Sequence, residues 1–383
     1  MGNYSNALQY IEKSFQILKK VHSQNHPDFA ISYNSAALVY DSMGNYSKAL
    51  ECYEKSLRIF ESILPSDHQN LATTCDNIGL VHNNMGDYTK AFQYIEKSLR
   101  IREKFLFQNH LSLAASYNNI GLVYNNMGDY VKALPYYKKS LRIREIVLSP
   151  SHQDLAVSYN NIGQVYNNMS DYSKALLYYE KSLRIRLLIL SPNHRDVAIS
   201  YSNFGQVYNN LRDYSKALSY YEKSLTILQI AASPNERDLG ISYSNLGQVY
   251  GSMRDYSKAL EYYNRALRIK ETINPPNRHD LAASYHNIGL VYDNTGDHFK
   301  ALEYYGNSNR ILEDVLPPNH PDIIISYNNI GASYNNVNEY SKSLEYYEKA
   351  LRILEKVLPQ NFSLWASVTM TILRVSITIW VII

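Results

Sequence analysis

Residues 154–190, which read DLAVSYNNIGQVYNNMSDYSKALLYYEKSLRIRLLIL, contain two amphipathic segments separated by a short turn. In each segment apolar residues recur at three- and four-residue spacing, which is the spacing of one face of an α-helix. Asp154 can cap the first segment or favour its dipole, and Asp171 can cap the second. Because Pro192 cannot continue a helix, it ends the second segment. The stretch therefore predicts a pair of helices.

The same pattern recurs every 42 residues along almost the whole chain. The Asp-Tyr dipeptide that opens the second segment begins at residues 87, 129, 171, 213 and 255, a constant step. In a repeat array each unit packs only on its neighbours, so a chain of 383 residues needs no single large core. We therefore expect an all-α fold, a solenoid of antiparallel helix pairs.

Small residues also recur at fixed positions. Glycine lies midway along the first helix of most units, as at Gly163, and alanine lies early in the second helix, as at Ala175. An interior glycine costs a helix about 1 kcal/mol relative to alanine, so its repetition indicates a close contact with a neighbouring helix. We expect the alanine to face the glycine across that contact.

The order of a large residue, then Ile-Gly, then Tyr, then the alanine of the second helix resembles the tetratricopeptide repeat. Tyr159, Gly163 and Ala175 belong to one such set. The longer unit of 42 residues, with its Asn-His-Pro-Asp loop at residues 25–28 and 319–322, looks like the kinesin light chain subclass. This resemblance implies a right-handed superhelical solenoid that binds other proteins.

By the same resemblance, the first helices line a concave face on which amide side chains bind a ligand. Asn and Gln carry both donors and acceptors, so a ladder of them can hydrogen-bond an extended peptide. The predicted peptide-binding residues are Asn77, Asn118, Asn119, Asn126, Asn160, Asn161, Gln164, Asn168, Asn203, Gln206, Asn210, Asn245, Gln248, Asn287 and Asn329. A second interpretation is that the asparagines are copies of one ancestral unit and that several of them simply face solvent.

Composition argues against several other functions. A net charge of +3 is too balanced for a nucleic-acid surface, which needs a clustered basic face. Cys52 and Cys75 lack metal-ligand spacing, and so few cysteines suit a reducing compartment, so we expect a cytoplasmic protein. No phosphate loop, nucleophile elbow or carboxylate pair occurs. We therefore expect no enzyme activity, no small-molecule cofactor and no nucleic-acid partner.

Six histidines recur once per repeat in the loop before the first helix. They are His26, His68, His110, His152, His194 and His320. Ligands of one metal ion must converge to about 2 Å from it, and residues a full repeat apart are too distant for that. We expect these histidines to be loop and helix-start residues, and we expect no metal site.

The chain divides into three predicted regions. Residues 1–27 are a partial first repeat, namely a second helix and its loop; residues 28–361 form eight tetratricopeptide-type helix pairs; and residues 362–383 are an apolar tail outside the repeat. Met1 has the register of the methionines that end first helices, so we expect an internal start within a longer protein. The tail is a frameshifted continuation of the repeat, a membrane anchor of about 20 residues, or a disordered or packed end. We do not expect a membrane partner, although the apolar residues 363–383 leave that question open.

The function that these features favour is a protein–protein interaction scaffold. It would bind an extended peptide or a partner helix in an Asn-rich concave groove. Two alternatives depend on sequence ahead of Met1. The chain is then the repeat arm of a longer enzyme, or a cargo adaptor like the kinesin light chains, which by resemblance requires a heptad coiled coil before the repeats.

Overall fold

The computed structural model describes residues 4–23, 25–231, 235–273 and 277–357. All the regular secondary structure in these residues is helical. The chain falls into two compact units, Met1–Pro234 and Asn235–Ile383, which are considered separately below. The apolar tail predicted at residues 362–383 lies outside the described residues.

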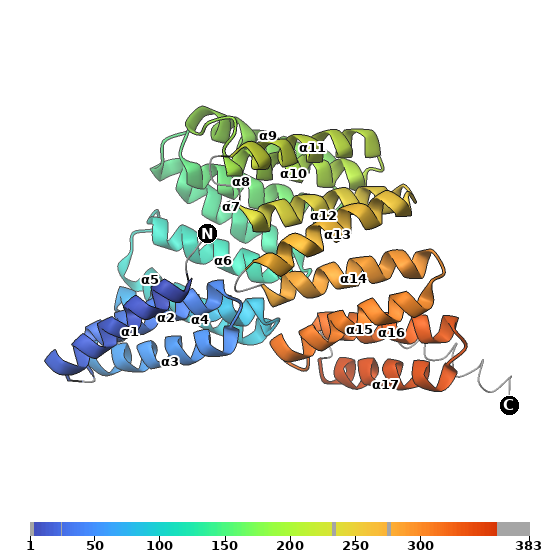
Figure 1. Cartoon of the computed structure of the whole chain (residues 1–383). Helices are drawn as coiled ribbons and strands as arrows, with labels where there is room; N and C mark the ends of the chain where they lie inside the picture. Colours follow the sequence, from blue (N-terminus) through green and yellow to red (C-terminus); the bar gives the residue numbers. More distant parts are fainter. Residues whose placement is uncertain (1–3, 24, 232–234, 274–276, 358–383) are drawn as a thin grey trace. The chain divides into compact units, whose positions relative to one another are not determined.

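The first unit contains one helix followed by five helix pairs (Figure 1). These are α1 (Tyr4–Val21), α2 (Pro27–Ser42), α3 (Tyr46–Ile63), α4 (Gln69–Asn84), α5 (Tyr88–Phe105), α6 (Leu111–Asn126), α7 (Tyr130–Val147), α8 (Gln153–Asn168), α9 (Tyr172–Ile189), α10 (Arg195–Asn210) and α11 (Tyr214–Ile230). Each helix contacts the next one along the chain. The even-numbered helices from α2 onward are the first helices of the predicted pairs.

The second unit contains three further pairs built in the same way. These are α12 (Glu236–Ser252) with α13 (Tyr256–Thr272), α14 (Arg278–Asn294) with α15 (His298–Val315), and α16 (Pro321–Asn336) with α17 (Tyr340–Val357). The prediction of an all-α solenoid of antiparallel helix pairs is therefore confirmed within each unit. None of the helices in the described part of the chain is both long and apolar enough to span a membrane.

The helix ends are capped by different residue types in the two helices of a pair. Asp171 accepts a hydrogen bond from the backbone N–H of Lys174 at 3.2 Å, so the predicted cap of the second helix is confirmed. The first helix is capped by His152 and not by Asp154. Its Nδ1 atom accepts a hydrogen bond from the Asp154 N–H at 3.1 Å. Of the two roles expected of Asp154, the cap is therefore taken by His152, while Asp154 lies in the first turn, where its charge favours the helix dipole.

The atoms that lie nearest the mid-helix glycine belong to a tyrosine ring in six of the described pairs, and to Ile95 at Gly79, rather than to the side chain of the predicted alanine. A Cβ atom placed on Gly163 would lie 2.7 Å from Cδ1 of Tyr179. The same close approach recurs between Gly289 and Tyr305, at 2.8 Å. Ala175 is fully buried, but it lies one helical turn before Tyr179. The flat ring needs the space of the absent side chain, which accounts for the repeated cost of an interior glycine.

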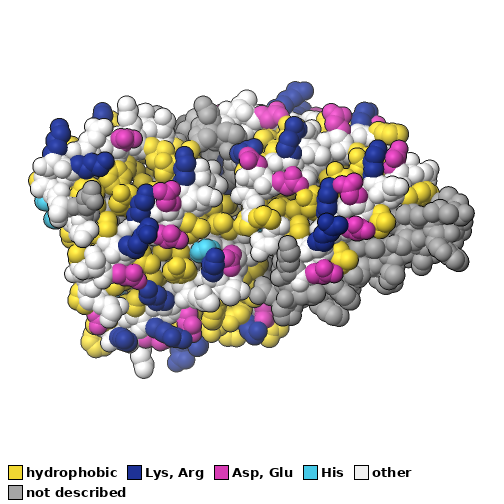
Figure 2. Space-filling view, turned by 90° about the horizontal axis from the view of Figure 1, so that it is seen from below, with side chains coloured by type: hydrophobic (Ala, Val, Ile, Leu, Met, Phe, Trp, Pro, Cys, Tyr) yellow, Lys and Arg dark blue, Asp and Glu magenta, His cyan; other side chains and the backbone are white. Residues whose placement is uncertain are grey.

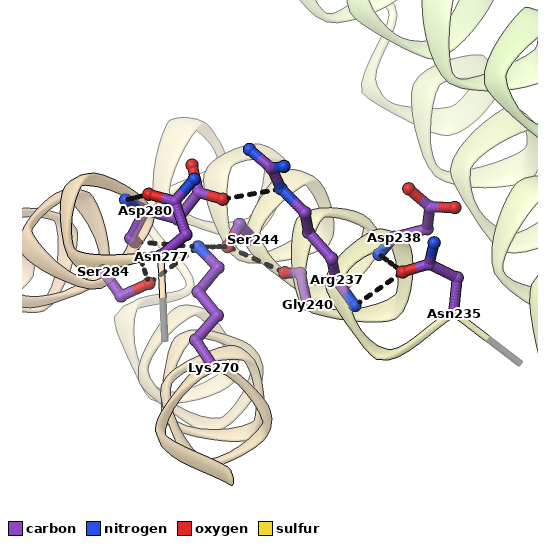
Figure 3. A network of polar contacts seen from close by, with 9 residues as sticks. All are labelled: Asn235, Arg237, Asp238, Gly240, Ser244, Lys270, Asn277, Asp280 and Ser284. Carbon is purple, nitrogen blue, oxygen red and sulfur yellow. Dashed lines mark hydrogen bonds and ion pairs between the residues drawn. The ribbon is translucent and has the colours of Figure 1, made fainter. Parts of the chain in front are cut away.

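Neighbouring pairs are joined by a long cationic side chain near the end of some second helices. Lys270 in α13 donates hydrogen bonds to Ser284 Oγ at 2.8 Å, to the Asp280 carbonyl at 3.3 Å and to Ser244 Oγ at 3.4 Å (Figure 3). Arg186 makes the equivalent bonds in the first unit, to Ser200 Oγ at 2.7 Å. Burial lowers the pKa of Lys270, which is 7% exposed. Each such cation bridges a second helix to the first helix that follows it.

Candidate peptide-binding surface

The predicted binding residues lie on one side of each first helix, beside the stripe that packs in the core. In α8 this side carries Val157, Asn160, Asn161, Gln164 and Asn168, at three- and four-residue spacing. Val157 is 37% exposed and the four amide residues are half-buried. We call these five residues and their equivalents in the other first helices the amide stripe. Its members are accessible to a ligand, unlike the buried residues of the packing stripe.

Amide side chains of adjacent first helices are hydrogen-bonded to one another. Asn161 donates from Nδ2 to Asn118 Oδ1 at 2.9 Å, and Asn203 donates in the same way to Asn160 at 2.6 Å. In both bonds the donor belongs to the later repeat. Asn161 and Asn203 therefore belong to a ladder of amide hydrogen bonds that joins α10 to α8 and α8 to α6.

A second ladder runs parallel to the first near the ends of the same helices. Its bonds are Asn126 Nδ2 to Asn83 Oδ1 at 3.3 Å, Asn168 Nδ2 to Asn125 Oδ1 at 3.2 Å, and Asn210 Nδ2 to Asn167 Oδ1 at 3.1 Å. The asparagines of the two ladders are therefore not simply solvated. They join successive repeats, a role that the sequence analysis did not foresee.

Gln164 connects the stripe to the core of its own helix pair. Its Oε1 atom accepts a hydrogen bond from the Tyr179 hydroxyl at 3.1 Å, and its Nε2 donates to Asn168 Oδ1 at 3.0 Å. These two bonds fix which end of the amide is oxygen and which is nitrogen. The orientation of this amide is thus set by bonds within its own helix pair.

Two carboxylates occupy ladder positions in the first unit. Asp41 in α2 has the register of Asn83 and is hydrogen-bonded by Asn84, and burial raises its pKa. Asp76 in α4 holds the place that Asn118 has in α6, and it is 5% exposed. Burial raises the pKa of Asp76, while Arg102 and a hydrogen bond from Asn119 oppose the rise. Arg102 pairs with Asp76 and donates to Ser116 Oγ at 2.5 Å. The stripe of α6, α8 and α10 itself carries no charged residue.

The amide stripe changes character in the second unit. His286, in the ladder position of Asn118, lines a pocket of about 220 Å³ together with Asn287, Asp322 and Ile325. His279 Nε2 lies 2.8 Å from Asp322 Oδ2, and this contact raises the pKa of His279. Burial lowers the pKa of His286. In this unit an imidazole, that of His286, therefore joins the amides of the stripe, and the carboxylate of Asp322 lies beside them in the same pocket.

The remaining predicted residues lie on the same face of their helices without taking part in either ladder. Asn77, Gln206, Asn245, Asn287 and Asn329 are half-buried, and Gln248 is exposed. The predicted binding set contained only amides, and the structure adds exposed aliphatic members to the stripe. These are Ile31, Leu38, Val157, Ile241, Leu290 and Ile325, each more than a third exposed. The sequence does indicate these residues, because an apolar residue outside the packing stripe recurs at the same register in several units.

Charge on the rest of the surface is mixed. Figure 2 shows basic and acidic side chains next to one another over one face, with no large area of a single sign. Several of these charges are paired along one helix, as in Lys55 with Glu51 at 2.6 Å. Exposed pairs of this kind contribute little to stability.

The sequence matches the family model described as tetratricopeptide repeat over residues 1–62, 69–146, 112–187, 154–230, 196–272 and 280–356. The chain belongs to the tetratricopeptide repeat family. No curated protein sequence matches it.

Solved structures that resemble this tetratricopeptide repeat chain include three proteins of low sequence identity. A Rap protein complexed with Competence and Sporulation Factor is 11% identical with a TM-score of 0.57, covering 91% of this chain and 98% of that one. The apo form of RapI is 17% identical with a TM-score of 0.51, covering 75% and 98%. A putative kinesin light chain from Podosopora anserina is 20% identical with a TM-score of 0.46, covering 54% and 99%. At such identities the likeness concerns the fold alone.

Proposed function

We propose that this chain is an interaction scaffold that binds an extended peptide along the amide stripe of its first helices. The observation that carries the proposal is the pair of amide ladders in α4, α6, α8 and α10, on a surface that also exposes aliphatic side chains. Membership of the tetratricopeptide repeat family supports a role in protein interaction. The Rap protein with a similar fold was solved with a bound factor, which agrees with this type of use.

The ladder leaves hydrogen-bonding capacity for a ligand. Each Asn side chain has two N–H donors and a carbonyl oxygen with two lone pairs, and a ladder bond uses one donor of one residue and one lone pair of the next. Regularly spaced amides of fixed orientation can therefore pair with the N–H and C=O groups of an extended backbone. Val157 and its aliphatic equivalents add apolar contacts beside that backbone.

The chemistry of the stripe also selects the partner. Because α6, α8 and α10 offer no charged residue on this face, a peptide segment of neutral composition fits it best. Binding to such a surface depends little on ionic strength, since screening acts on charges. A cytoplasmic location, and the absence of enzyme activity and of nucleic-acid partners, stay predictions.

Replacing Asn161 and Asn203 together by Ala tests the proposal. The probe is a peptide selected on the wild-type chain from a random display library. Loss of about two hydrogen bonds, each worth about 1 kcal/mol, should raise its Kd roughly thirtyfold. Asn193→Ala, at an exposed loop position, is the matched control and should leave the Kd unchanged.

Because Asn161 and Asn203 also join repeats, binding has to be separated from folding. Circular dichroism melts of the double variant identify any loss of stability. Gln206→Ala changes the same face without breaking either ladder, and it should weaken binding about fivefold while leaving the melt unchanged. Equal Kd values for wild type, the double variant and Gln206→Ala would rule out the amide stripe as the binding surface.

A further inference from the structure

The loop between α1 and α2 brings together three side chains that suit a metal ion. His22 Nε2 lies 3.9 Å from Asp28 Oδ2, and His26 Nδ1 lies 3.4 Å from the same oxygen. The two imidazole rings are stacked with their centroids 3.7 Å apart. Because an imidazole nitrogen binds a metal in the plane of its ring, one of the two rings has to turn before both nitrogens point at one ion. The possible ligand atoms of His22, His26 and Asp28 all lie within 4.8 Å of one another. No other three His, Cys, Asp or Glu side chains among the described residues come this close together.

The repeat itself shows that His22 is an addition to the common loop. The capping histidine and the acidic residue two positions later recur elsewhere, for example as His152 and Asp154. The position of His22, however, is leucine in most of the other units, namely Leu64, Leu106, Leu148, Leu190 and Leu316. Those leucines are half-buried or buried, so the fold favours an apolar residue there. The first loop has exchanged this apolar contact for a third potential ligand.

We propose that His22, His26 and Asp28 form a zinc-binding site. Two imidazole nitrogens and one carboxylate oxygen are a ligand set that Zn²⁺ accepts, with water in the fourth position of a tetrahedron. Bonds of about 2.0–2.2 Å place the ligand atoms of such a site roughly 3.4 Å apart. The distance from His26 to Asp28 already has this value, and that from His22 to Asp28 exceeds it by half an ångström. The side chains are a third to a half exposed, which leaves room for the water.

Zinc binding at this site replaces one existing interaction. His26 Nδ1 accepts the cap hydrogen bond from the Asp28 N–H at 3.3 Å, whereas the equivalent bond of His152 measures 3.1 Å. The bond that zinc displaces is thus the longer one. In return, the ion links the end of α1, none of whose described residues is buried, to the start of α2. The expectation of no metal site rested on histidines one repeat apart, and His22 lies outside that series.

Calorimetric titration of the full chain with Zn²⁺, in a preparation without a polyhistidine tag, tests the proposal. We expect one equivalent of tight binding in the wild type. His22→Leu restores the residue of the other loops and should abolish this tight zinc binding. The zinc affinity should fall by more than about 100-fold, because losing a group that only orients a metal ligand already costs up to that factor. Co²⁺ absorption bands of a tetrahedral site should appear in the wild type and vanish in the variant.

Asp28→Asn provides a second test that keeps the size of the side chain, and Asp154→Asn is its matched control. Both residues follow a capping histidine by two positions, but only Asp28 has His22 beside it. Asp28→Asn should lose the equivalent and Asp154→Asn should keep it. The proposal is overturned if the wild type binds no tight equivalent, or if His22→Leu and Asp28→Asn bind zinc as the wild type does. This site does not depend on the peptide-binding proposal.

Discussion

At the scale of single residues, most of the mid-helix glycines are explained by the tyrosine ring that lies on them, while Ile95 takes the place of the ring at Gly79. The rings of Tyr179 and Tyr305 approach Gly163 and Gly289 more closely than a Cβ atom would allow. Glycine elsewhere in a helix has no such reason, as at Gly306 in α15, where a Cβ atom would meet nothing within 4 Å. The same residue type therefore has opposite energetic meanings within one helix pair.

Alanine substitution of these two glycines should shift stability in opposite directions. Gly289→Ala forces Tyr305 to move and should lower the free energy of unfolding by about 1–3 kcal/mol. Gly306→Ala meets open space in a helix and should raise it by about 0.4–1 kcal/mol. Urea denaturation of both variants measures the difference. If Gly289→Ala were as stable as the wild type, the ring contact would not be the reason for the glycine.

At the scale of helices, the position of Lys270 shows that one joint between repeats can be made in two ways. Lys270 fills this position with a buried cation, whereas Leu312 fills it in the next pair. The hydroxyls that Lys270 contacts also have backbone partners of their own. Ser284 Oγ donates to the Asp280 carbonyl at 3.2 Å, and Ser244 Oγ donates to the Gly240 carbonyl at 3.0 Å.

Lys270→Leu should therefore be tolerated, while Lys270→Ala should not. The leucine removes a buried charge and leaves both serines bonded, so the free energy of unfolding should stay within about 1 kcal/mol of the wild type or rise. The alanine leaves a cavity and should cost about 2 kcal/mol or more. Chemical denaturation measures the free energy of unfolding of the two variants and of the wild type. Equal losses would mean that the polar bonds, not the filled volume, hold this joint.

At the scale of the whole molecule, buried tyrosines recur from pair to pair and make the array sensitive to alkaline pH. Burial raises the pKa of Tyr179 and Tyr221, and raises that of Tyr263 and Tyr347 to about 12. An unfolded chain releases a tyrosine proton near pH 10. The folded state holds these protons more tightly, so their contribution is fully present below about pH 10 and is lost as the pH rises through the folded pKa values.

Tyr263→Phe isolates one of these groups. The phenyl ring keeps the contact with Gly247, so melting near pH 8 should change little. Above about pH 10 the variant should lose stability less steeply than the wild type, because one fewer proton is released on unfolding. Circular dichroism melts from about pH 8 to 12 check this, with tyrosinate absorbance followed in parallel. Parallel pH profiles for the two proteins would contradict the assigned pKa.

The sequence by itself determined the period, the helix pairs and the caps of the second helices. These features are local, since apolar spacing, turn residues and an aspartate such as Asp171 act within a few residues of chain. It also located the face that carries Asn161 and Gln164, because helical spacing assigns residues to a side. The sequence analysis did not predict the histidine caps of the first helices, because His is not among the residues that usually cap helices.

Only the tertiary structure decided which side chains meet across helices. Asn161 donates a hydrogen bond to Asn118 instead of facing solvent alone. The ring of Tyr179 lies nearest to Gly163, and the imidazole of His22 lies close to the carboxylate of Asp28. Each of these contacts depends on the distance and tilt between two helices, which the packing of large side chains sets and which no repeat pattern encodes. The repeat specified which positions are equivalent, and the packing specified their partners.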